Sequence, residues 1–125
     1  VSNLLEQLPN EGSLEIKKLE KILKLTKKAD RRKLEIAMAL ASDAQLLLLD
    51  EPMAGLGPTE TKEMIALLKR LKGQQTMLLI EHDMDAVFAL ADQISVLVSG
   101  EIIATGKPDT IRRDSEVQSA YLGEI

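Results

Sequence analysis

The chain has 125 residues, of which 45% are hydrophobic and 29% charged, the composition of one globular domain with its own core. A formal net charge of -4 argues against bulk nucleic-acid binding, and the absence of cysteine excludes disulfides and thiolate metal sites. An aromatic content of 2% leaves almost no side chains on which bases stack.

The sequence offers no segment that targets or anchors the chain in a membrane. No apolar run approaches the ~18 residues that span a bilayer. The stretch from Val1 to Gln7 lacks the basic and apolar regions of a signal peptide. We therefore expect a cytoplasmic protein.

The first part of the chain has helical periodicity. An amphipathic helix is predicted over 14–25, with Ser13 as its N-cap, and a second helix over 30–41. Residues 17–33 are rich in lysine and arginine, which is typical of a patch for an anionic surface or nucleic acid, or of a solvated helix face. We favour the solvated face. The regular pattern of this stretch also resembles designed helices.

From Leu46 onward, predicted strands and helices alternate. The four leucines of 46–49 are typical of a strand buried on both faces. Alternation of this kind predicts an α/β fold with a parallel sheet of about three strands, right-handed crossovers and a final hairpin. The further elements are a helix from Pro58 to Gly73, a strand over 76–81, a helix over 83–91, strands over 93–98 and 101–105 joined by Ser99 and Gly100, and helices over 108–113 and 115–122.

Acidic and imidazole side chains follow two of the predicted strands. Asp50 and Glu51 end the leucine run, and His82 follows the strand over 76–81. Ligands of parallel sheets bind beyond the carboxyl ends of the strands, so these three side chains are expected to converge if the two strands are adjacent. Asp50 would hold Mg²⁺ through water, Glu51 would position or deprotonate an attacking water, and His82 would donate to a γ-phosphate.

Each residue also has a simpler interpretation. An Asp-Glu pair after a strand is often a solvated turn and helix cap, and a lone histidine beside acids is often a surface residue. A Mg²⁺- or phosphate-binding module using Asp50, Glu51 and Asp83 is a third interpretation. The order and spacing of the three residues favour the nucleotide site.

Residues 31–125 resemble the C-terminal half of an ATP-binding subunit of an ABC transporter, most like those for branched-chain amino acid uptake. The resemblance is carried by 34–41, the Walker B run 46–52, the segment 54–61, the switch-histidine segment 79–84, the stretch 99–106 and the ending 120–124. It implies an incomplete P-loop NTPase-like fold preceded by a weakly related or redesigned helical segment over 1–30.

The resemblance also implies roles, a cofactor and partners. Asp50 would be the Mg²⁺-associated Walker B residue, Glu51 the catalytic base and His82 the switch histidine, with Met53 to Pro58 as the D-loop. Mg-ATP would be the ligand. The family docks on membrane permease subunits at the inner face of the cell membrane and dimerises, and no nucleic acid is implied.

Two phosphate-gripping motifs of that family do not occur in this sequence. No Gly-x-x-x-x-Gly-Lys-Ser/Thr string is present, so no cofactor-binding residue is assigned. Where the family has its signature loop, the chain has Thr26 to Asp30, and Gly57 stands where the D-loop has an acid or amide. We therefore expect the isolated chain to be inactive as an ATPase.

The missing strand has a structural consequence. In the parent family the Walker A strand lies between the histidine-bearing strand and the strand over 93–98, so its absence leaves two unpaired edges. Such edges tend to pair with other chains, and we expect strand rearrangement or a strand-exchanged homodimer, with the N-terminal helices over the exposed face. The alternative function is that of an engineered or excised non-catalytic α/β scaffold.

Overall fold

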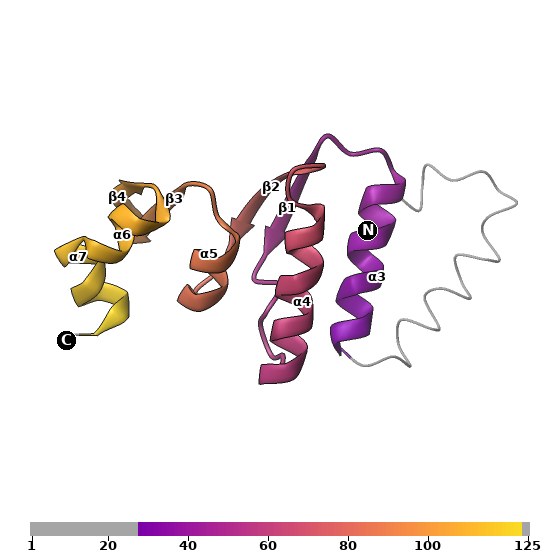
Figure 1. The fold of residues 1–125 in the computed structure, drawn as a ribbon, viewed down its shortest axis with the longest axis horizontal. Coiled ribbons are helices and arrows are strands. Elements are labelled where there is room, and N and C mark those ends of the chain that lie inside the picture. The colour runs from indigo at the N-terminus through magenta and orange to yellow at the C-terminus, as the bar shows by residue number, and fades with distance from the viewer. Residues whose placement is uncertain (1–27, 124–125) are drawn as a thin grey trace, which may run out of the picture. The chain divides into compact units, whose positions relative to one another are not determined.

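A computed structural model describes residues 28–123 of the chain (Figure 1). The helix predicted over 14–25 lies outside the described residues. The chain divides into two compact units, residues 1–78 and 79–125. Each unit is described by itself below.

The first unit has a strand–helix–strand core preceded by a helix. Helix α3 (Lys28–Ala41) leads to strand β1 (Leu46–Asp50), helix α4 (Pro58–Leu71) and strand β2 (Thr76–Ile80), whose last two residues fall in the second unit, and β1 pairs with β2. Helix α4 begins at Pro58, whose fixed φ suits a first turn, and the Glu60 carboxylate accepts a hydrogen bond from the Gly57 N–H at 3.3 Å. Gly73, with a φ of +92°, lies just beyond its end.

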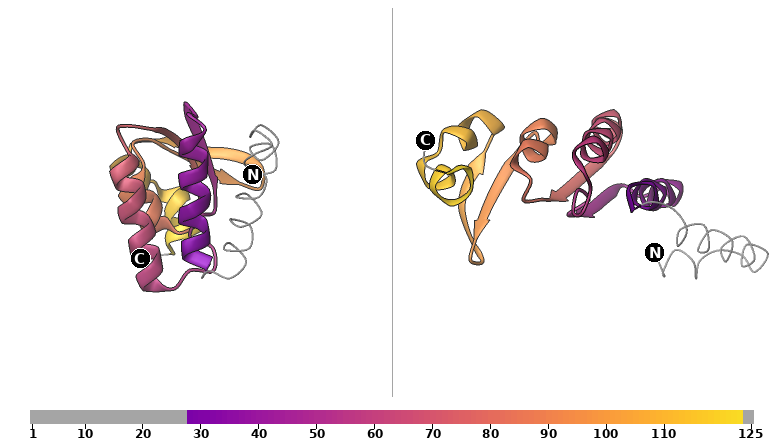
Figure 2. Two further views of the ribbon diagram at one scale, coloured as in Figure 1. Left: turned by 90° about the vertical axis from the view of Figure 1, so that its right-hand side faces the viewer. Right: turned by 90° about the horizontal axis from the view of Figure 1, so that it is seen from below.

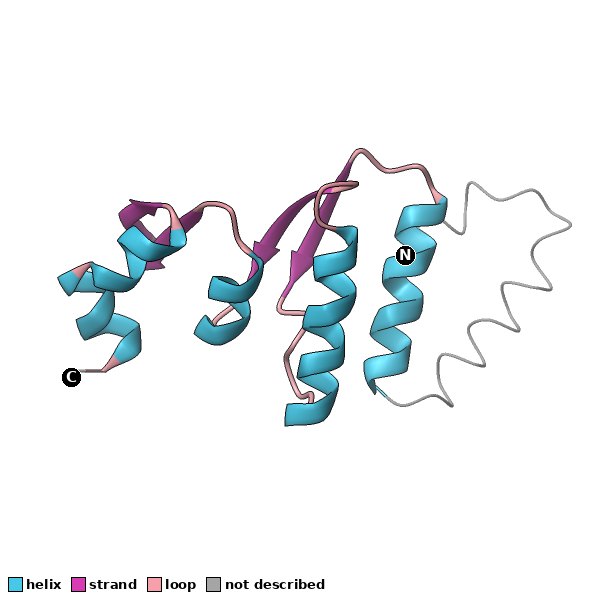
Figure 3. Cartoon of the chain, viewed as in Figure 1, coloured by secondary structure: helices cyan, strands magenta, loops and turns pink. Residues whose placement is uncertain are grey.

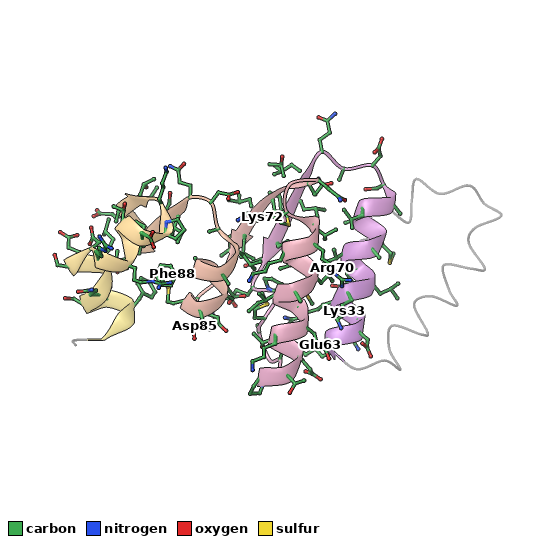
Figure 4. The ribbon with its side chains drawn as sticks, viewed as in Figure 1. Lys33, Glu63, Arg70, Lys72, Asp85 and Phe88 are labelled. Carbon is green, nitrogen blue, oxygen red and sulfur yellow. The ribbon has the colours of Figure 1, made fainter. Side chains whose placement is uncertain are left out.

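Helices α3 and α4 lie side by side (Figures 1 and 2). The buried side chains of this unit are all apolar: Ala29, Ile36, Leu47, Met53, Met64 and Leu68. On the outside, Lys33 Nζ lies 3.0 Å from Glu63 Oε2, and the two residues are labelled in Figure 4. Both side chains of this pair are partly exposed, so the pair contributes little to stability.

The leucine run of β1 is not buried on both faces, and that prediction was wrong. Leu47 is buried, whereas Leu46 and Leu48 are 50% and 69% exposed, as are Leu78 and Ile80 on β2 at 56% and 57%. Along both strands the exposed side chains alternate with buried or half-buried ones, so one face of the strand pair is covered and the other is exposed. We call these four side chains the open sheet face; they are Leu46, Leu48, Leu78 and Ile80.

The second unit consists of a hairpin with short helices around it. Helix α5 (Met84–Leu90) precedes strands β3 (Ile94–Val98) and β4 (Glu101–Gly106), which Figure 3 shows in magenta. Helices α6 (Pro108–Arg113) and α7 (Ser115–Val117) follow, with a π-helical turn over Gln118–Leu122. The hairpin turn has positive φ at both central residues, +49° at Ser99 and +84° at Gly100, the geometry that matches the twist of paired strands.

The hairpin packs on the closing helices around a small core. Strands β3 and β4 are antiparallel, and a bulge opposite Val96 and Leu97 leaves one extra residue on β4. Four residues form the buried cluster, and Val87, Phe88, Ile103 and others pack against it; the four are Ile94, Val96, Ile111 and Val117. The Arg112 guanidinium lies 4.5 Å from the centroid of the Phe88 ring, and the Tyr121 hydroxyl donates to the Leu97 carbonyl at 2.6 Å.

The α/β class, the element order and the hairpin were predicted and are confirmed. Among the described residues β2 pairs with β1 alone and β3 with β4 alone, so the strands form two two-stranded sheets and not one run of three parallel strands. The strand-exchanged dimer stays a prediction. No helix of the described part has the length and apolarity that crossing a membrane requires.

Candidate functional site

The two candidate catalytic carboxylates lie where β1 ends. Asp50 is the last residue of the strand and Glu51 follows it, and both are exposed. Glu51 has a φ of +47°, in the left-handed region that non-glycine residues rarely adopt and that costs about 1–2 kcal/mol. The chain therefore turns abruptly at Glu51.

Arg32 of α3 holds this turn from the side. Its Nη1 donates to the carbonyl of Glu51 at 3.1 Å and also to the carbonyl of Pro52. These charge-assisted bonds fix the backbone on the C-terminal side of the strained residue. Since a side chain leaves from its own Cα, fixing this backbone also restricts where the Glu51 carboxylate can reach.

The segment after Glu51, predicted to be the D-loop, is anchored at several points. Met53 is buried, and turn hydrogen bonds join Ala54 N–H to the Glu51 carbonyl and Leu56 N–H to the Met53 carbonyl, at 3.0 and 3.1 Å. Gly55 has a φ of +72°, and a Cβ at this position would lie 2.5 Å from Lys28 Nζ. The positive φ favours glycine here, whereas the Lys28 ammonium, at the end of a flexible side chain, can move aside. The loop meets the first residue of α3, in the region predicted to replace the signature loop.

His82 lies two residues beyond β2, with its side chain 69% exposed. The side chain of the preceding Glu81 is, in contrast, only 1% exposed. Its Oε1 accepts hydrogen bonds from the N–H groups of His82 and Asp83 at 3.0 and 3.3 Å. The same Oε1 lies 3.6 Å from His82 Nδ1. Asp83 is the N-cap of α5, accepting from the Ala86 N–H at 3.1 Å.

The structure brings Asp50 and Glu51 together and places His82 in the other unit. The pairing of β1 with β2 fulfils the condition under which convergence was predicted, but the convergence itself stays a prediction. Across the described residues no group of three or more His, Cys, Asp or Glu side chains is poised to hold a metal. Mg²⁺ commonly takes one or two carboxylates plus water and phosphate oxygens, so Asp50 with a nucleotide fits the ion.

Sequence reasoning assigned no role to two residues of this region. Arg32 is 19 residues from Glu51 in sequence, and only the packing of α3 brings its guanidinium to the turn. Glu81 belongs to the run that contains His82, but nothing in the pattern distinguishes its buried carboxylate from an exposed one. A charged residue directly after an apolar strand and before a histidine was the one available signal.

Curated relatives match most of this chain. It is 46% identical over 97 residues to "High-affinity branched-chain amino acid transport ATP-binding protein LivG" of Escherichia coli (strain K12), covering 76% of this chain and 38% of the relative. It is 45% identical over 96 residues to "High-affinity branched-chain amino acid transport ATP-binding protein BraF" of Pseudomonas aeruginosa, covering 75% of this chain and 38% of the relative. The chain thus spans a little over a third of the length of these relatives.

Solved structures agree with the sequence matches. An ATP-binding cassette of an ABC transporter in its ADP conformation matches with a TM-score of 0.68 and 30% identity, covering 79% of this chain and 41% of that one. A nucleotide-free ATP-binding cassette matches with a TM-score of 0.70 and 26% identity, covering 94% and 53%.

Two family descriptions match parts of the chain. "Branched-chain amino acid ATP-binding cassette transporter" matches residues 101–124, and "Cyanobacterial RNase R, N-terminal domain" matches residues 2–40, most of which precede the described part. Nothing in these comparisons supports an engineered scaffold. The chain is thereby identified as part of an ATP-binding subunit of the ABC transporter family, most similar to the branched-chain amino acid type.

Proposed function

We propose that this chain supplies the hydrolytic residues of an ATP-hydrolysing subunit that drives import of branched-chain amino acids. The observation that carries the proposal is the turn at the end of β1, where Asp50 and Glu51 are exposed and Arg32 fixes the backbone. The substrate class comes from the names of the relatives LivG and BraF. The proposal extends their printed descriptions to a chain that covers 38% of their length.

Each residue has one task in this proposal. Asp50 holds Mg²⁺ through water, and Mg-ATP, when bound, supplies the phosphoryl group to be transferred. Glu51 accepts a hydrogen bond or a proton from water and so orients it for in-line attack. His82 donates a hydrogen bond toward the γ-phosphate and reports its presence. Such positioning and charge stabilisation account for most of the catalysis of phosphoryl transfer.

The chain alone is proposed to be inactive, because its sequence contains no phosphate-binding loop of the Gly-x-x-x-x-Gly-Lys-Ser/Thr type. Nucleotide is expected to bind only where that loop is supplied, by residues beyond this sequence or by another polypeptide. We further propose that the assembled subunit works at the inner face of the cell membrane on permease subunits, as members of this family do. A homodimer of this chain through the free edges of β2 and β3 is part of the proposal.

The test compares ATP hydrolysis by the chain alone with hydrolysis after mixing with the complementary N-terminal part of a LivG-type subunit. We expect no turnover by the chain alone, and turnover by the mixture that Glu51→Gln lowers by at least ~100-fold. Glu101→Gln, at an exposed glutamate of β4, is the matched control. Turnover by the chain alone that Glu51→Gln abolishes would overturn the inactivity, and a mixture indifferent to Glu51→Gln would overturn the assigned role.

A second measurement detects the nucleotide directly. His82 is the only histidine of the chain, so its imidazole resonances are unambiguous in an NMR spectrum. Titration with millimolar Mg-ATP is expected to leave them unmoved in the chain alone and to shift them in the mixture. A metal-dependent rise in melting temperature without nucleotide would instead favour a simple Mg²⁺-binding module.

A further inference from the structure

Glu81 has an unusual environment for a carboxylate next to an exposed histidine. Its side chain is 1% exposed, and burying a charged group is costly unless hydrogen bonds compensate. The compensation comes from the N–H groups of His82 and Asp83, which both donate to Oε1, at 3.0 and 3.3 Å. One buried oxygen thus fixes two consecutive peptide groups, and the first of them belongs to His82.

Capping of the following helix does not explain this arrangement. Helix α5 starts at Met84, and its N-cap is Asp83, whose Oδ1 accepts from the Ala86 N–H at 3.1 Å. The two bonds of Glu81 are made before the helix, to the residues that carry the imidazole out of the strand. The buried carboxylate therefore acts on the segment between β2 and α5.

The same oxygen also faces the histidine ring. Glu81 Oε1 lies 3.6 Å from His82 Nδ1, which is beyond hydrogen-bond distance but close enough for an electrostatic preference. An ionised carboxylate is an acceptor only, so it favours a proton on Nδ1 and disfavours a lone pair there. With a proton already on Nδ1, a second proton goes to Nε2, which then becomes a donor as well.

We propose that Glu81 is a positioning residue for His82, which fixes the backbone of residues 82–83 and keeps a proton on Nδ1, so that Nε2 is the nitrogen that takes a second proton from solvent and donates its N–H to the γ-phosphate. This inference rests on the proposed function, in which His82 contacts the γ-phosphate. It adds to that function the residue that orients the sensor. Glu81 itself contacts no ligand in this proposal and acts only through His82.

The test uses the full 125-residue chain, labelled with ¹⁵N and ¹³C, without nucleotide. Long-range ¹H–¹⁵N spectra recorded at about pH 9 give the ratio of the Nδ1–H to the Nε2–H tautomer. We expect the Nδ1–H form to predominate and the ratio to fall about fivefold in Glu81→Gln, which removes the charge but keeps an acceptor oxygen. The amide proton signals of His82 and Asp83 are expected to move upfield in the same variant.

Glu101→Gln is the matched control, because it removes an exposed carboxylate of the same unit and is expected to leave the ratio unchanged. A ratio equally insensitive to Glu81→Gln would overturn the proposal. If that variant does not fold, the unmodified chain still decides, since predominance of the Nε2–H form in it contradicts the proposal. The tautomer ratio is measured without ATP hydrolysis. The role of Glu81 can therefore be refuted while the role of Glu51 stands, and the role of Glu51 can be refuted while that of Glu81 stands.

Discussion

The hairpin unit and the β1–β2 sheet are both built from apolar strands, but the two bury those strands to different extents. Ile94 and Val96 of β3 are buried against Ile111 and Val117, which come from the next two helices in the chain. The sheet buries Leu47 and leaves the four side chains of the open sheet face at 50–69% exposure. The hairpin also exposes Leu97 and Ile102, at 56% and 64%, so its strands bury two large apolar side chains and expose two, whereas the strands of the sheet bury one and expose four.

The difference has a functional consequence. Contiguous exposed apolar patches are rare on soluble monomers and usually mark an interface. Three of the four residues of the open sheet face, Leu46, Leu48 and Leu78, belong to the unit that carries the candidate carboxylates. The candidate carboxylates thus follow the strand pair that exposes the larger number of apolar side chains.

The largest expected effect on the free energy of unfolding comes from replacing a buried isoleucine of the hairpin unit by alanine, compared with the same change at an exposed isoleucine of the sheet. Ile111 is 1% exposed and Ile80 is 57% exposed. Ile111→Ala is expected to lower the free energy of unfolding of the hairpin unit by about 2–4 kcal/mol, because it leaves a cavity in a small core. Ile80→Ala is the matched control and is expected to cost about 1 kcal/mol or less, mainly from strand propensity. Urea unfolding followed by circular dichroism and by residue-resolved NMR measures both.

Equal costs for the two isoleucines would contradict the comparison. A cost at Ile80 near that of Ile111 would mean that the open sheet face is covered in solution, by a second copy or by residues outside 28–123. Repeating the measurement over a tenfold range of protein concentration separates these two cases, because only association depends on concentration.

The next effect concerns the turn at the candidate site. Arg32→Ala removes both hydrogen bonds from Nη1 to the carbonyls of Glu51 and Pro52. It is expected to lower the free energy of unfolding by about 1–2 kcal/mol, since the bonds are charge-assisted but partly solvated. Arg70→Ala, at an exposed arginine of α4, is the control and is expected to stay within about 0.5 kcal/mol. Thermal unfolding and amide exchange of residues 51–56 are the measurements. Unchanged exchange in Arg32→Ala would refute the anchoring role.

Several features of the molecule could be predicted from sequence because they are local. Pro58 and Gly73 mark the bounds of α4, Ser99 and Gly100 mark the hairpin turn, and the position of Asp50 at a strand end follows from the leucine run. Burial could not be predicted in the same way. Four consecutive leucines have no period, so they are compatible with one covered face or two, and the choice depends on what packs on each side. The long-range contact of Arg32 and the burial of Glu81 likewise depend on tertiary packing.

The smallest expected effect on stability tests what the open sheet face does. Leu48→Thr combined with Leu78→Thr keeps the strand region favourable for β structure while making two exposed positions polar, so the free energy of unfolding is expected to change by about 1 kcal/mol or less. Leu47→Thr is the matched control, because the same change at a buried position places a hydroxyl in the core and is expected to cost about 2–3 kcal/mol.

The double variant with Leu48→Thr and Leu78→Thr also separates two routes of self-association. If copies associate through the open sheet face, the double variant lowers the associated fraction in sedimentation velocity, because the apolar area that drives contact is reduced. If they associate through the free edges of β2 and β3, the backbone groups responsible are untouched and the fraction stays the same. An unchanged fraction therefore supports the edge-paired homodimer, while a lower one assigns the contact to the face left open beside Asp50.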